Sequence, residues 1–382
     1  MRSALLTTAA LLTTAVALTI GVSLVAAPSA EAAPASAGAV PGPGGTAPAA
    51  SPGTADRHHH PVKSFDLQAH RGGIGERTES SLASFSHALE VGVSTLELDT
   101  QITKDNKVVV THDRKTNPAV CADTAPAVAG DPAYPYVGKF VKDLTLRQLK
   151  TLDCGYQQRP GYPQQVAVPG SRMLELHQVF DLVKKYRAKK VMMNIETKVE
   201  AGAPQETAPR ELFVRLVYAE IARSGLSRQV TIQSFDWGAL MAMHRLDRRL
   251  PLVALTNYDF LQVGQPGASP WLGGIDADDF GGDFVRAAAA IDGVVALSPN
   301  DGFPQGGSIN DPHFRPYVTA DMVRRAHQRG LTVIPWTVDD PATQQYMIDI
   351  GVDGLITNYP TRLRGIMADN GLRLPKQYRP HC

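Results

Sequence analysis

From residue 63 onward, short runs of apolar residues alternate along the chain with segments of helical periodicity. The apolar runs predict nine strands, at residues 65–72, 95–102, 107–113, 190–198, 229–236, 251–257, 293–300, 331–340 and 353–360. Apolar positions three and four apart predict helices, at 81–92, 174–187, 209–224, 237–248, 319–329, 341–350 and 361–369. This alternation is typical of parallel strands joined by helical crossovers, and at this length it favours an α/β protein with a (β/α)8 TIM barrel.

Two features depart from a regular barrel. Nine strands are predicted where a barrel needs eight, and no helix fits between Asp99 and Val108, so one predicted strand is expected to lie outside the ring. Residues 114–172 are rich in Pro, Gly, Ala and Tyr and interrupt the alternation, which predicts an irregular insertion after the third strand. Its tyrosines could form an aromatic rim for a substrate head group or the small core of a loop-rich cap, and we favour the cap.

The first 62 residues are expected to lie outside the folded domain, which we place at 63–382. Residues 1–32 combine Arg2, a long uncharged apolar run and an A-x-A site at Ala30 and Ala32, which predicts a cleaved secretory signal peptide. The alternative is an uncleaved membrane anchor. Residues 33–62, rich in Pro, Ala and Gly, predict a disordered linker. We therefore expect a secreted protein with no stable membrane insertion after cleavage.

Charge and cysteine content narrow the function further. The 382 residues carry a net charge of +1 without any block of like charge, which argues against nucleic-acid partners and against a polybasic membrane patch. There is no Gly-rich phosphate loop, and no G-x-S-x-G elbow of a serine hydrolase. Cys121 and Cys154 are expected to pair in an exported chain, which leaves Cys382 over.

Polar side chains gather where the predicted strands end. The carboxyl ends of parallel barrel strands face one common pocket. The residues at these ends, in chain order, are His70 and Arg71, Glu97 and Asp99, His112 and Asp113, Glu196 and Lys198, Gln233 and Ser234, and Trp336. Glu97 and Asp99 are two positions apart and so point to the same side of their strand. Asp113 could either orient a histidine or cap the turn that follows it.

Three carboxylates converging in one pocket require a positive partner. A divalent cation that prefers oxygen ligands, Ca²⁺ or Mg²⁺, would suit Glu97, Asp99 and Glu196. Two histidines can act as general acid and general base, and Arg and Lys bind phosphate oxygens. The pattern therefore predicts metal-assisted hydrolysis of a phosphodiester.

The motifs resemble the glycerophosphodiester phosphodiesterase family. They are "AHRGG" (69–73), "LELDTQITKDNKVVVTHD" (96–113), "IETK" (195–198), "PWTVDD" (335–340) and "GVDGLITNYP" (351–360), in the order expected for that family. The resemblance implies a barrel enzyme that hydrolyses small glycerophosphodiesters to sn-glycerol 3-phosphate and an alcohol. It does not indicate the oligomeric state.

The same resemblance implies a role for each candidate residue. Glu97, Asp99 and Glu196 match the metal ligands, and His70 and His112 match the catalytic histidines. Arg71 and Lys198 match the phosphate contacts, and Trp336 matches an aromatic residue that lines the substrate site. One departure is "TESS" (78–81) where the family usually has Pro-Glu-Asn-Thr. Ser81 can still cap the following helix, but a polar contact of the missing Asn is put in doubt.

Three rival functions remain open. A phospholipase D-like enzyme could act on intact lipid from the same barrel, although no strong apolar patch is evident at the expected mouth. A teichoic-acid-type polymer could be the substrate instead. A non-catalytic secreted protein that binds phosphate or metal is disfavoured, because it would be expected to lack at least one key residue and none is missing.

Overall fold

The strands of the computed structural model, which describes residues 64–380, alternate between two environments. Leu96 and Leu98 on β2 (Thr95–Ile102) are fully buried against the surrounding helices, whereas Glu97 and Asp99 point to the opposite face. Because side chains alternate across a strand, a sheet that closes on itself places one set inside and the other outside. The apolar outer set forms the main core between strands and helices.

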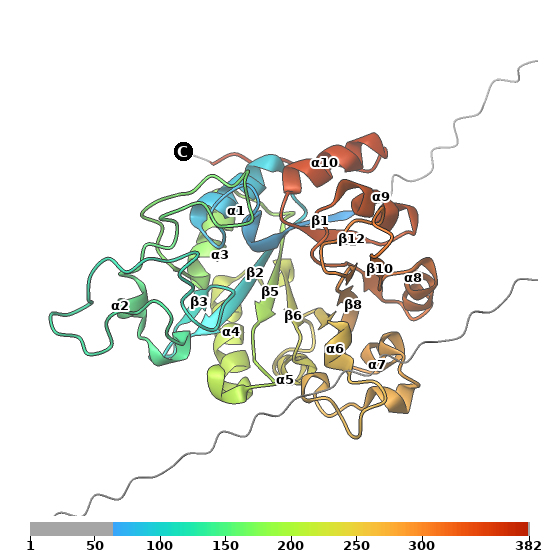
Figure 1. The fold of residues 1–382 in the computed structure, drawn as a ribbon, viewed down its shortest axis with the longest axis horizontal. Helices are drawn as coiled ribbons and strands as arrows, with labels where there is room; N and C mark the ends of the chain where they lie inside the picture. The colour runs from blue at the N-terminus through green and yellow to red at the C-terminus, as the bar shows by residue number, and fades with distance from the viewer. Residues whose placement is uncertain (1–63, 381–382) are drawn as a thin grey trace, which may run out of the picture. The chain divides into compact units, whose positions relative to one another are not determined.

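Eight strands form the ring, with helices on its outside (Figure 1). The hydrogen-bonded order is β11–β8–β7–β6–β5–β2–β1–β12, and every neighbouring pair is parallel. Besides β2, these strands are β1 (Asp66–Ala69), β5 (Met192–Thr197), β6 (Val230–Ser234), β7 (Leu252–Thr256), β8 (Val294–Pro299), β11 (Thr332–Val333) and β12 (Gly354–Thr357).

Backbone hydrogen bonds also join the two ends of this series. Asp353 N donates to Val333 O at 2.9 Å, and Ile356 N donates to Pro335 O at 2.9 Å. Val338 N donates to Ile356 O at 3.0 Å. The segment that continues β11 therefore bridges to β12 and completes the predicted (β/α)8 arrangement.

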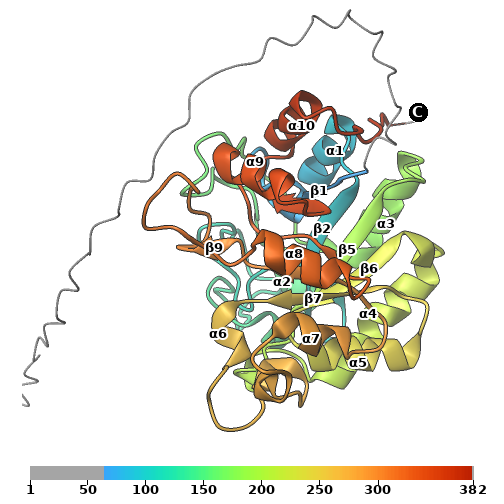
Figure 2. The same cartoon turned by 90° about the vertical axis from the view of Figure 1, so that its right-hand side faces the viewer.

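Helices follow the strands as the periodicity predicts. Figure 2 shows several of them packed around the outside of the strands. They are α1 (Leu82–Val91), α3 (Leu176–Lys185), α4 (Arg210–Ser224), α5 (Trp237–Leu246), α8 (Ala320–His327), α9 (Pro341–Asp349) and α10 (Pro360–Asp369). Short α6 (Tyr258–Leu261) and α7 (Phe284–Ala289) fill the β7–β8 crossover, where the sequence predicted no helix. None of the helices within residues 64–380 has the length and apolar character needed to cross a bilayer.

The surplus strand is β3 (Val108–Val110), which is antiparallel and lies outside the ring. β3 pairs with the C-terminal end of β2, and β4 (Leu174–Glu175) pairs with β3 on its other side. His112 and Asp113 were expected to end a parallel strand of the barrel. That expectation was wrong, because β3, the strand that precedes them, runs antiparallel to β2. After β2 the chain turns back at Asn106, which has a φ of 60°, and brings His112 beside Asp99 from the opposite side.

The predicted insertion lies between β3 and β4. It contains only short elements, chiefly α2 (Leu146–Leu149). A separate short antiparallel pair, β9 (Gly302–Phe303) and β10 (Arg315–Pro316), follows β8 and is not part of the insertion. Cys121 and Cys154 form the expected disulfide. Tyr136 is fully buried in a separate small core and Tyr134 packs edge-on against it, which agrees with a loop-rich cap. The predicted signal peptide, linker and Cys382 lie outside the described residues.

Candidate active site

The candidate site is a pocket of about 460 Å³ at the carboxyl ends of the barrel strands. The eight residues to which the sequence assigned roles line it, as do Asp113, Gln233 and aromatic side chains from the later loops. Ser234, also expected at a strand end, instead donates its hydroxyl to Thr197 O at 2.8 Å and is not among the lining residues. Two of the carboxylates lie side by side on neighbouring strands, because Asp99 on β2 is the register partner of Glu196 on β5. The sequence thus predicted correctly which residues come together, whereas their chemical roles remain predictions.

The three carboxylates form a buried cluster. One oxygen from each of Glu97, Asp99 and Glu196 lies within 4.8 Å of the others, and their residues are 2%, 1% and 5% exposed. Arg71 N donates to Glu97 Oε2 at 2.9 Å, and Gln233 Nε2 donates to Glu97 Oε1 at 2.7 Å. Asp99 Oδ2 accepts no hydrogen bond. Oxygen ligands gathered in this way could hold Ca²⁺ or Mg²⁺.

The electrostatics of the cluster fit a bound cation. Burial, followed by the charge of Asp99, raises the pKa of Glu97 well above its usual value. Burial also raises the pKa of Glu196 to about 7, although Lys198 opposes the shift. Burial alone would raise the pKa of Asp99 too, but Lys198, His112 and Arg71 hold it below its usual value. Without a cation, these three groups therefore resist being ionised together.

The first strand delivers two groups through a strained turn. Arg71 has a φ of 51°, a left-handed conformation that is unusual for a residue with a side chain and is often found at functional sites. Gly72 follows with a φ of 80°, and a Cβ there would lie 2.6 Å from Ser84 Oγ, so only glycine fits. This turn points the Arg71 backbone N–H at Glu97 and its guanidinium toward Asp99, with Nε 3.3 Å from Oδ2.

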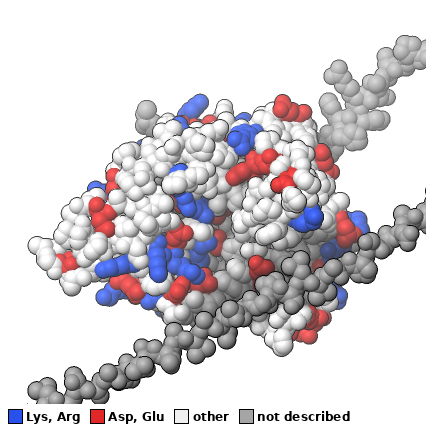
Figure 3. Space-filling view, viewed as in Figure 1, with Lys and Arg blue, Asp and Glu red and all other residues white. Residues whose placement is uncertain are grey.

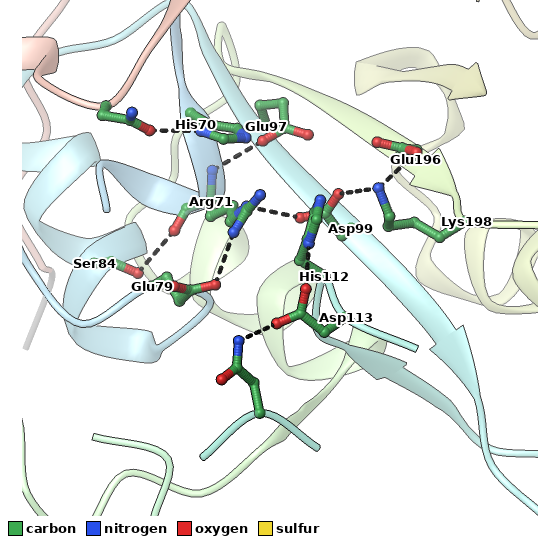
Figure 4. A network of polar contacts seen from close by, with 12 residues as sticks. His70, Arg71, Glu79, Ser84, Glu97, Asp99, His112, Asp113, Glu196 and Lys198 are labelled. Atoms are coloured by element: carbon green, nitrogen blue, oxygen red, sulfur yellow. Dashed lines mark hydrogen bonds and ion pairs between the residues drawn. The ribbon is translucent and has the colours of Figure 1, made fainter. Parts of the chain in front are cut away.

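Both candidate catalytic histidines are fixed at Nδ1 (Figure 4). His70 Nδ1 lies 2.6 Å from Asn358 Oδ1, and the other end of that amide, Nδ2, donates to Asp339 Oδ2 at 2.6 Å. Asp339 also accepts a hydrogen bond from the Asn358 backbone N–H. Because the side-chain nitrogen of Asn358 points at Asp339, its side-chain oxygen faces His70, and His70 Nδ1 donates to that oxygen. His70 thus keeps Nε2 available for proton transfer.

His112 is oriented by the residue next to it. Its Nδ1 lies 2.8 Å from Asp113 Oδ1, and Asn117 Nδ2 donates to Asp113 Oδ2 at 2.6 Å. Burial opposes ionisation of Asp113, but its contact with His112 lowers the pKa of the carboxyl to about 2. Of the two roles considered for Asp113, the structure supports orientation of the histidine.

The pocket keeps both histidines neutral. Burial, followed by the charge of Arg71, lowers the pKa of His70 to about 3. A third of the His112 side chain is exposed, yet its enclosure in the pocket and the charges of Arg71 and Lys198 lower its pKa to about 4. At neutral pH both rings can therefore accept a proton.

The basic groups pair with the acidic cluster. Lys198 Nζ lies 3.0 Å from Glu196 Oε1 and 3.6 Å from Asp99 Oδ1. Arg71 Nη1 donates to Glu79 Oε1 at 3.0 Å. Both cations lie where an anionic group in the pocket could reach them. On the face shown in Figure 3, basic and acidic side chains are interspersed rather than separated into patches of one sign.

Aromatic residues form the other wall of the pocket. Trp336 is half-buried, and its Nε1 donates to Ser298 O at 2.9 Å, which fixes the indole. Phe235 packs edge-on against it, with ring centroids 5.2 Å apart. Phe260 and Trp271, from the loops after β7, stack at 4.2 Å and continue this wall. The pocket therefore has a charged side and an aromatic side.

The sequence did not predict several supporting residues. Asn358 directly follows β12 and Asp339 lies in "TVDD", so the rule that strand ends face the pocket could have found both. Glu79 lies in "TESS", and its ion pair with Arg71 was not expected. Arg159 lies in the irregular insertion, where no periodic signal places a side chain, and it too pairs with Glu79.

Comparison with known proteins identifies this arrangement. A sequence profile of the glycerophosphoryl diester phosphodiesterase family matches residues 70–362. A glycerophosphodiester phosphodiesterase of Caldanaerobacter subterraneus is 25% identical over 303 residues, which cover 79% of this chain and 98% of that protein. Human lysophospholipase D GDPD1 is 32% identical over 320 residues, which cover 78% and 85% of the two chains.

Solved structures show the same fold. A protein from Silicibacter pomeroyi that carries the same family assignment superposes with a TM-score of 0.65 at 27% identity, covering 82% of this chain and 96% of that one. A phosphodiesterase from Oleispira antarctica, solved with sn-glycerol-3-phosphate, superposes with a TM-score of 0.55 at 16% identity, over 79% and 96% of the two chains. The second likeness concerns the fold alone.

Proposed function

Since the chain belongs to the glycerophosphoryl diester phosphodiesterase family, we propose how its own residues cleave a glycerophosphodiester. The activity is that of a glycerophosphodiester phosphodiesterase, and the substrate is a small glycerophosphodiester. The proposed products are sn-glycerol 3-phosphate and an alcohol. The observation that carries the mechanism is a buried carboxylate cluster flanked by two histidines, each held at Nδ1 by an oxygen acceptor.

The cluster is suited to a divalent metal ion. Asp99 Oδ2 is buried without a hydrogen bond, and Glu97 and Glu196 resist ionisation beside it. Glu97, Asp99 and Glu196 would hold Ca²⁺ or Mg²⁺, which are the cations that prefer such ligands. When bound, the ion would supply Lewis-acid polarisation of a phosphoryl oxygen.

The charged side of the pocket positions the phosphate. Arg71 and Lys198 both lie beside Asp99, so a phosphate near the carboxylates would meet two cations that can bind its oxygens. Trp336 lies on the aromatic side and would contact the organic part of the substrate. This division orients the phosphodiester before reaction.

The two histidines move the protons. With Nδ1 occupied, each offers Nε2 to the substrate, and both are neutral near pH 7. One removes the proton from the attacking oxygen while the P–O bond forms. The other must first take up a proton from solvent at Nε2, which the negative charge of the bound phosphodiester favours. It then gives this proton to the leaving alcohol as the second P–O bond breaks. Such general acid–base catalysis typically contributes about 10²–10⁴-fold to the rate.

The test is hydrolysis of glycerophosphocholine with release of glycerol 3-phosphate. We expect activity with Ca²⁺ or Mg²⁺ that a chelator abolishes, and losses of about 10²–10⁴-fold in His70→Ala and His112→Ala. His177→Ala is the matched control, because that histidine lies on α3 with half its side chain exposed. Near-normal activity in both active-site variants, with unchanged thermal melts, would refute the assignment.

One observation favours a second substrate class. Phe235, Phe260 and Trp271 offer apolar ring surface that the polar hydroxyls of a glycerol moiety do not need, and the human relative is named a lysophospholipase D. A monoacyl phospholipid could place its chain against these rings. Assays of lysophosphatidylcholine and glycerophosphocholine side by side would decide which has the higher kcat/KM.

We also propose that the protein is exported. The Cys121–Cys154 disulfide supports this, because such bonds persist mainly outside the reducing cytosol. Fractionation of producing cells should recover mature protein, shortened at its N-terminus, outside the cytoplasm. Full-length protein confined to the cytosolic fraction would contradict this proposal.

A further inference from the structure

The second half of the insertion lies across the loop that carries Arg71. We call residues 157–168 the strap. Its Val166 pairs with Arg77 as an isolated parallel bridge, and Val166 N donates to Glu76 O at 3.1 Å. Thr78 N donates to Val166 O at 3.2 Å, and Val168 N donates to Thr78 Oγ1 at 2.9 Å. The strap is thus fastened to residues 76–78 by two backbone hydrogen bonds and one to the Thr78 hydroxyl.

A buried glutamine of the strap makes a further hydrogen bond to the loop that carries Arg71. Gln165 is 4% exposed, and its Nε2 donates to Ile74 O at 2.7 Å. Its Oε1 accepts from Arg159 N at 2.8 Å, which fixes the backbone from which the Arg159 side chain starts. These contacts hold the strap without any help from the Arg159 guanidinium.

The Arg159 guanidinium forms an ion pair with Glu79 Oε2, while Arg71 Nη1 occupies Glu79 Oε1 at 3.0 Å. One carboxylate therefore bridges two guanidiniums, only one of which lines the pocket. The side chains of Arg71, Glu79 and Arg159 are 9%, 6% and 21% exposed, so solvent screens this triad only partly.

The charge of the triad depends on Arg159. Arg71 and Arg159 carry one positive charge each and Glu79 carries one negative charge, which leaves a net charge of +1 behind the predicted phosphate position. Without Arg159, Glu79 would cancel the charge of Arg71 and draw its guanidinium away from Asp99. Arg71 already shares its donors between these two carboxylates.

We propose that Arg159 is a positioning residue for substrate binding, supplied by the insertion. It neutralises Glu79, so that the charge of Arg71 remains available to the substrate phosphate. This inference rests on the proposed function in taking Arg71 as a phosphate contact. It also gives a role to the insertion, whose strap carries a charge into the rear of the site.

The experiment compares Arg159→Ala, Arg159→Lys and the wild type, with Arg147→Ala as the matched control. Arg147 is an exposed arginine on α2 of the same insertion, and its side chain makes no hydrogen bond or ion pair with the described residues. The measurements are steady-state kinetics with glycerophosphocholine and the Kd of inorganic phosphate by calorimetry with Mg²⁺ present. Thermal melts test folding.

We expect Arg159→Ala to raise both KM and the phosphate Kd about tenfold, because the variant loses one partly buried positive charge behind Arg71 and leaves Glu79 to offset the charge of Arg71. The value of kcat should change less than KM. Arg159→Lys should recover most of the loss, and added salt should narrow the difference between the wild type and Arg159→Ala. Arg147→Ala should match the wild type.

Two results would overturn the inference. The first is a lower melting temperature in Arg159→Ala with unchanged KM and phosphate Kd, which would make Arg159 purely structural. The second is an equal rise of KM and phosphate Kd in Arg159→Lys and Arg159→Ala, which would show that the charge of residue 159 does not matter. Should Arg159→Ala fail to fold, Arg159→Gln supplies the neutral variant. Wild-type protein that binds phosphate but does not cleave glycerophosphocholine would contradict the proposed function alone, and phosphate affinities would still decide the role of Arg159.

Discussion

The two candidate catalytic histidines are held at the same ring nitrogen by acceptors of different charge. His70 faces the neutral amide oxygen of Asn358, whereas His112 faces the carboxylate of Asp113. A carboxylate stabilises an imidazolium more strongly than an amide does, so the two rings differ in proton affinity although both are enclosed. An acid–base pair needs such an asymmetry.

Replacing Asp113 with Ala should weaken this control of His112. The ring would lose the acceptor that sets its tautomer, and kcat should fall about 10–100-fold while KM stays within about threefold. Steady-state kinetics measure both constants. Asn117→Ala, which removes a contact to Asp113 and an acceptor for Ala119 N but leaves the Asp113 carboxylate in place, should cost less. An Asp113→Ala enzyme with wild-type kcat would show that the pairing has no catalytic role.

At the residue scale, the sequence predicted the side chains that converge on the pocket. The spacing of Glu97 and Asp99 was sufficient, because alternation along a strand puts both on one face. It could not predict Arg159, because irregular backbone has no period from which a side-chain direction can be calculated. The two roles considered for Asp113 could be separated only once its distance to His112 was known.

Single elements decide where the chain leaves the barrel plan. The antiparallel β3 returns His112 to the site, and the insertion that follows is closed by the Cys121–Cys154 bond across 33 positions. The small core around Tyr136 contains few apolar residues, and the disulfide cysteines belong to it. This element therefore depends on its covalent link more than the barrel does.

Replacing both cysteines with Ser should lower the free energy of unfolding by about 3–4 kcal/mol, the loop-closure value for this separation. Urea denaturation of the oxidised wild type and the double variant would measure the difference. If the insertion loosens locally, KM should rise as well, because the strap would no longer fix Arg159. A double variant equal to the wild type in stability and KM would contradict this expectation.

The loop after β8 contains a carboxylate that should make stability depend on pH. Asp301 is fully buried, and burial raises its pKa to about 7 in spite of hydrogen bonds from the backbone of Gly302 and Gly306. Because the folded state holds this proton more tightly, the stabilising contribution of Asp301 is greatest below about pH 4 and is lost as pH rises from about 4 to 7. The contribution is on the order of 4 kcal/mol at most.

Asp301→Asn removes this titration and should flatten that dependence. The wild type should lose stability relative to the variant as pH rises from 5 to 8, and it should be the less stable of the two at pH 8; urea midpoints of both proteins at the two pH values measure this. Equal pH differences in the two proteins would show that Asp301 is ionised in the folded state throughout this range.

At the element scale, periodicity predicted the ring strands and most helices, since amphipathic segments carry their own signal. It predicted one strand more than the ring holds. It could not show which strand was the surplus one, because antiparallel β3 has the same alternation as a barrel strand. The short α6 and α7 were missed, since helices of four and six residues hold too few turns to show a period.

The molecule as a whole divides its barrel interior into two halves. Gln68, Glu97, Asn194 and Gln233 make one half polar, and Val253, Ala296, Ile334 and Ile356 make the other apolar. Hydrogen bonds from Asn194 to Gln68 at 3.0 Å and to Gln233 at 2.8 Å form a polar layer. The charged side of the pocket rises from the polar half, whose carboxylates destabilise the metal-free fold.

Metal ions should therefore stabilise the entire domain. At a concentration 100 times Kd, Ca²⁺ or Mg²⁺ should add about 2.7 kcal/mol and raise the melting temperature by several degrees. Calorimetry with and without a chelator would detect the change. Glu196→Gln should reduce the rise, because it removes one ligand charge. Identical melts with chelator, Ca²⁺ and Mg²⁺ would argue against a metal site.

The pairing of β3 with β4 has a further consequence. Val110 and Leu174 are register partners, so the chain leaves for the insertion and returns from it at neighbouring points. A segment with adjacent ends can be exchanged as a cassette, because a short turn could join the two strands without moving α3. Chimaeras with junctions just after Asp113 and just before Met173 would keep His112 and Asp113 and would graft different rear walls onto one catalytic barrel. Phosphate affinity could then be tuned by protein engineering without altering any group that touches the substrate.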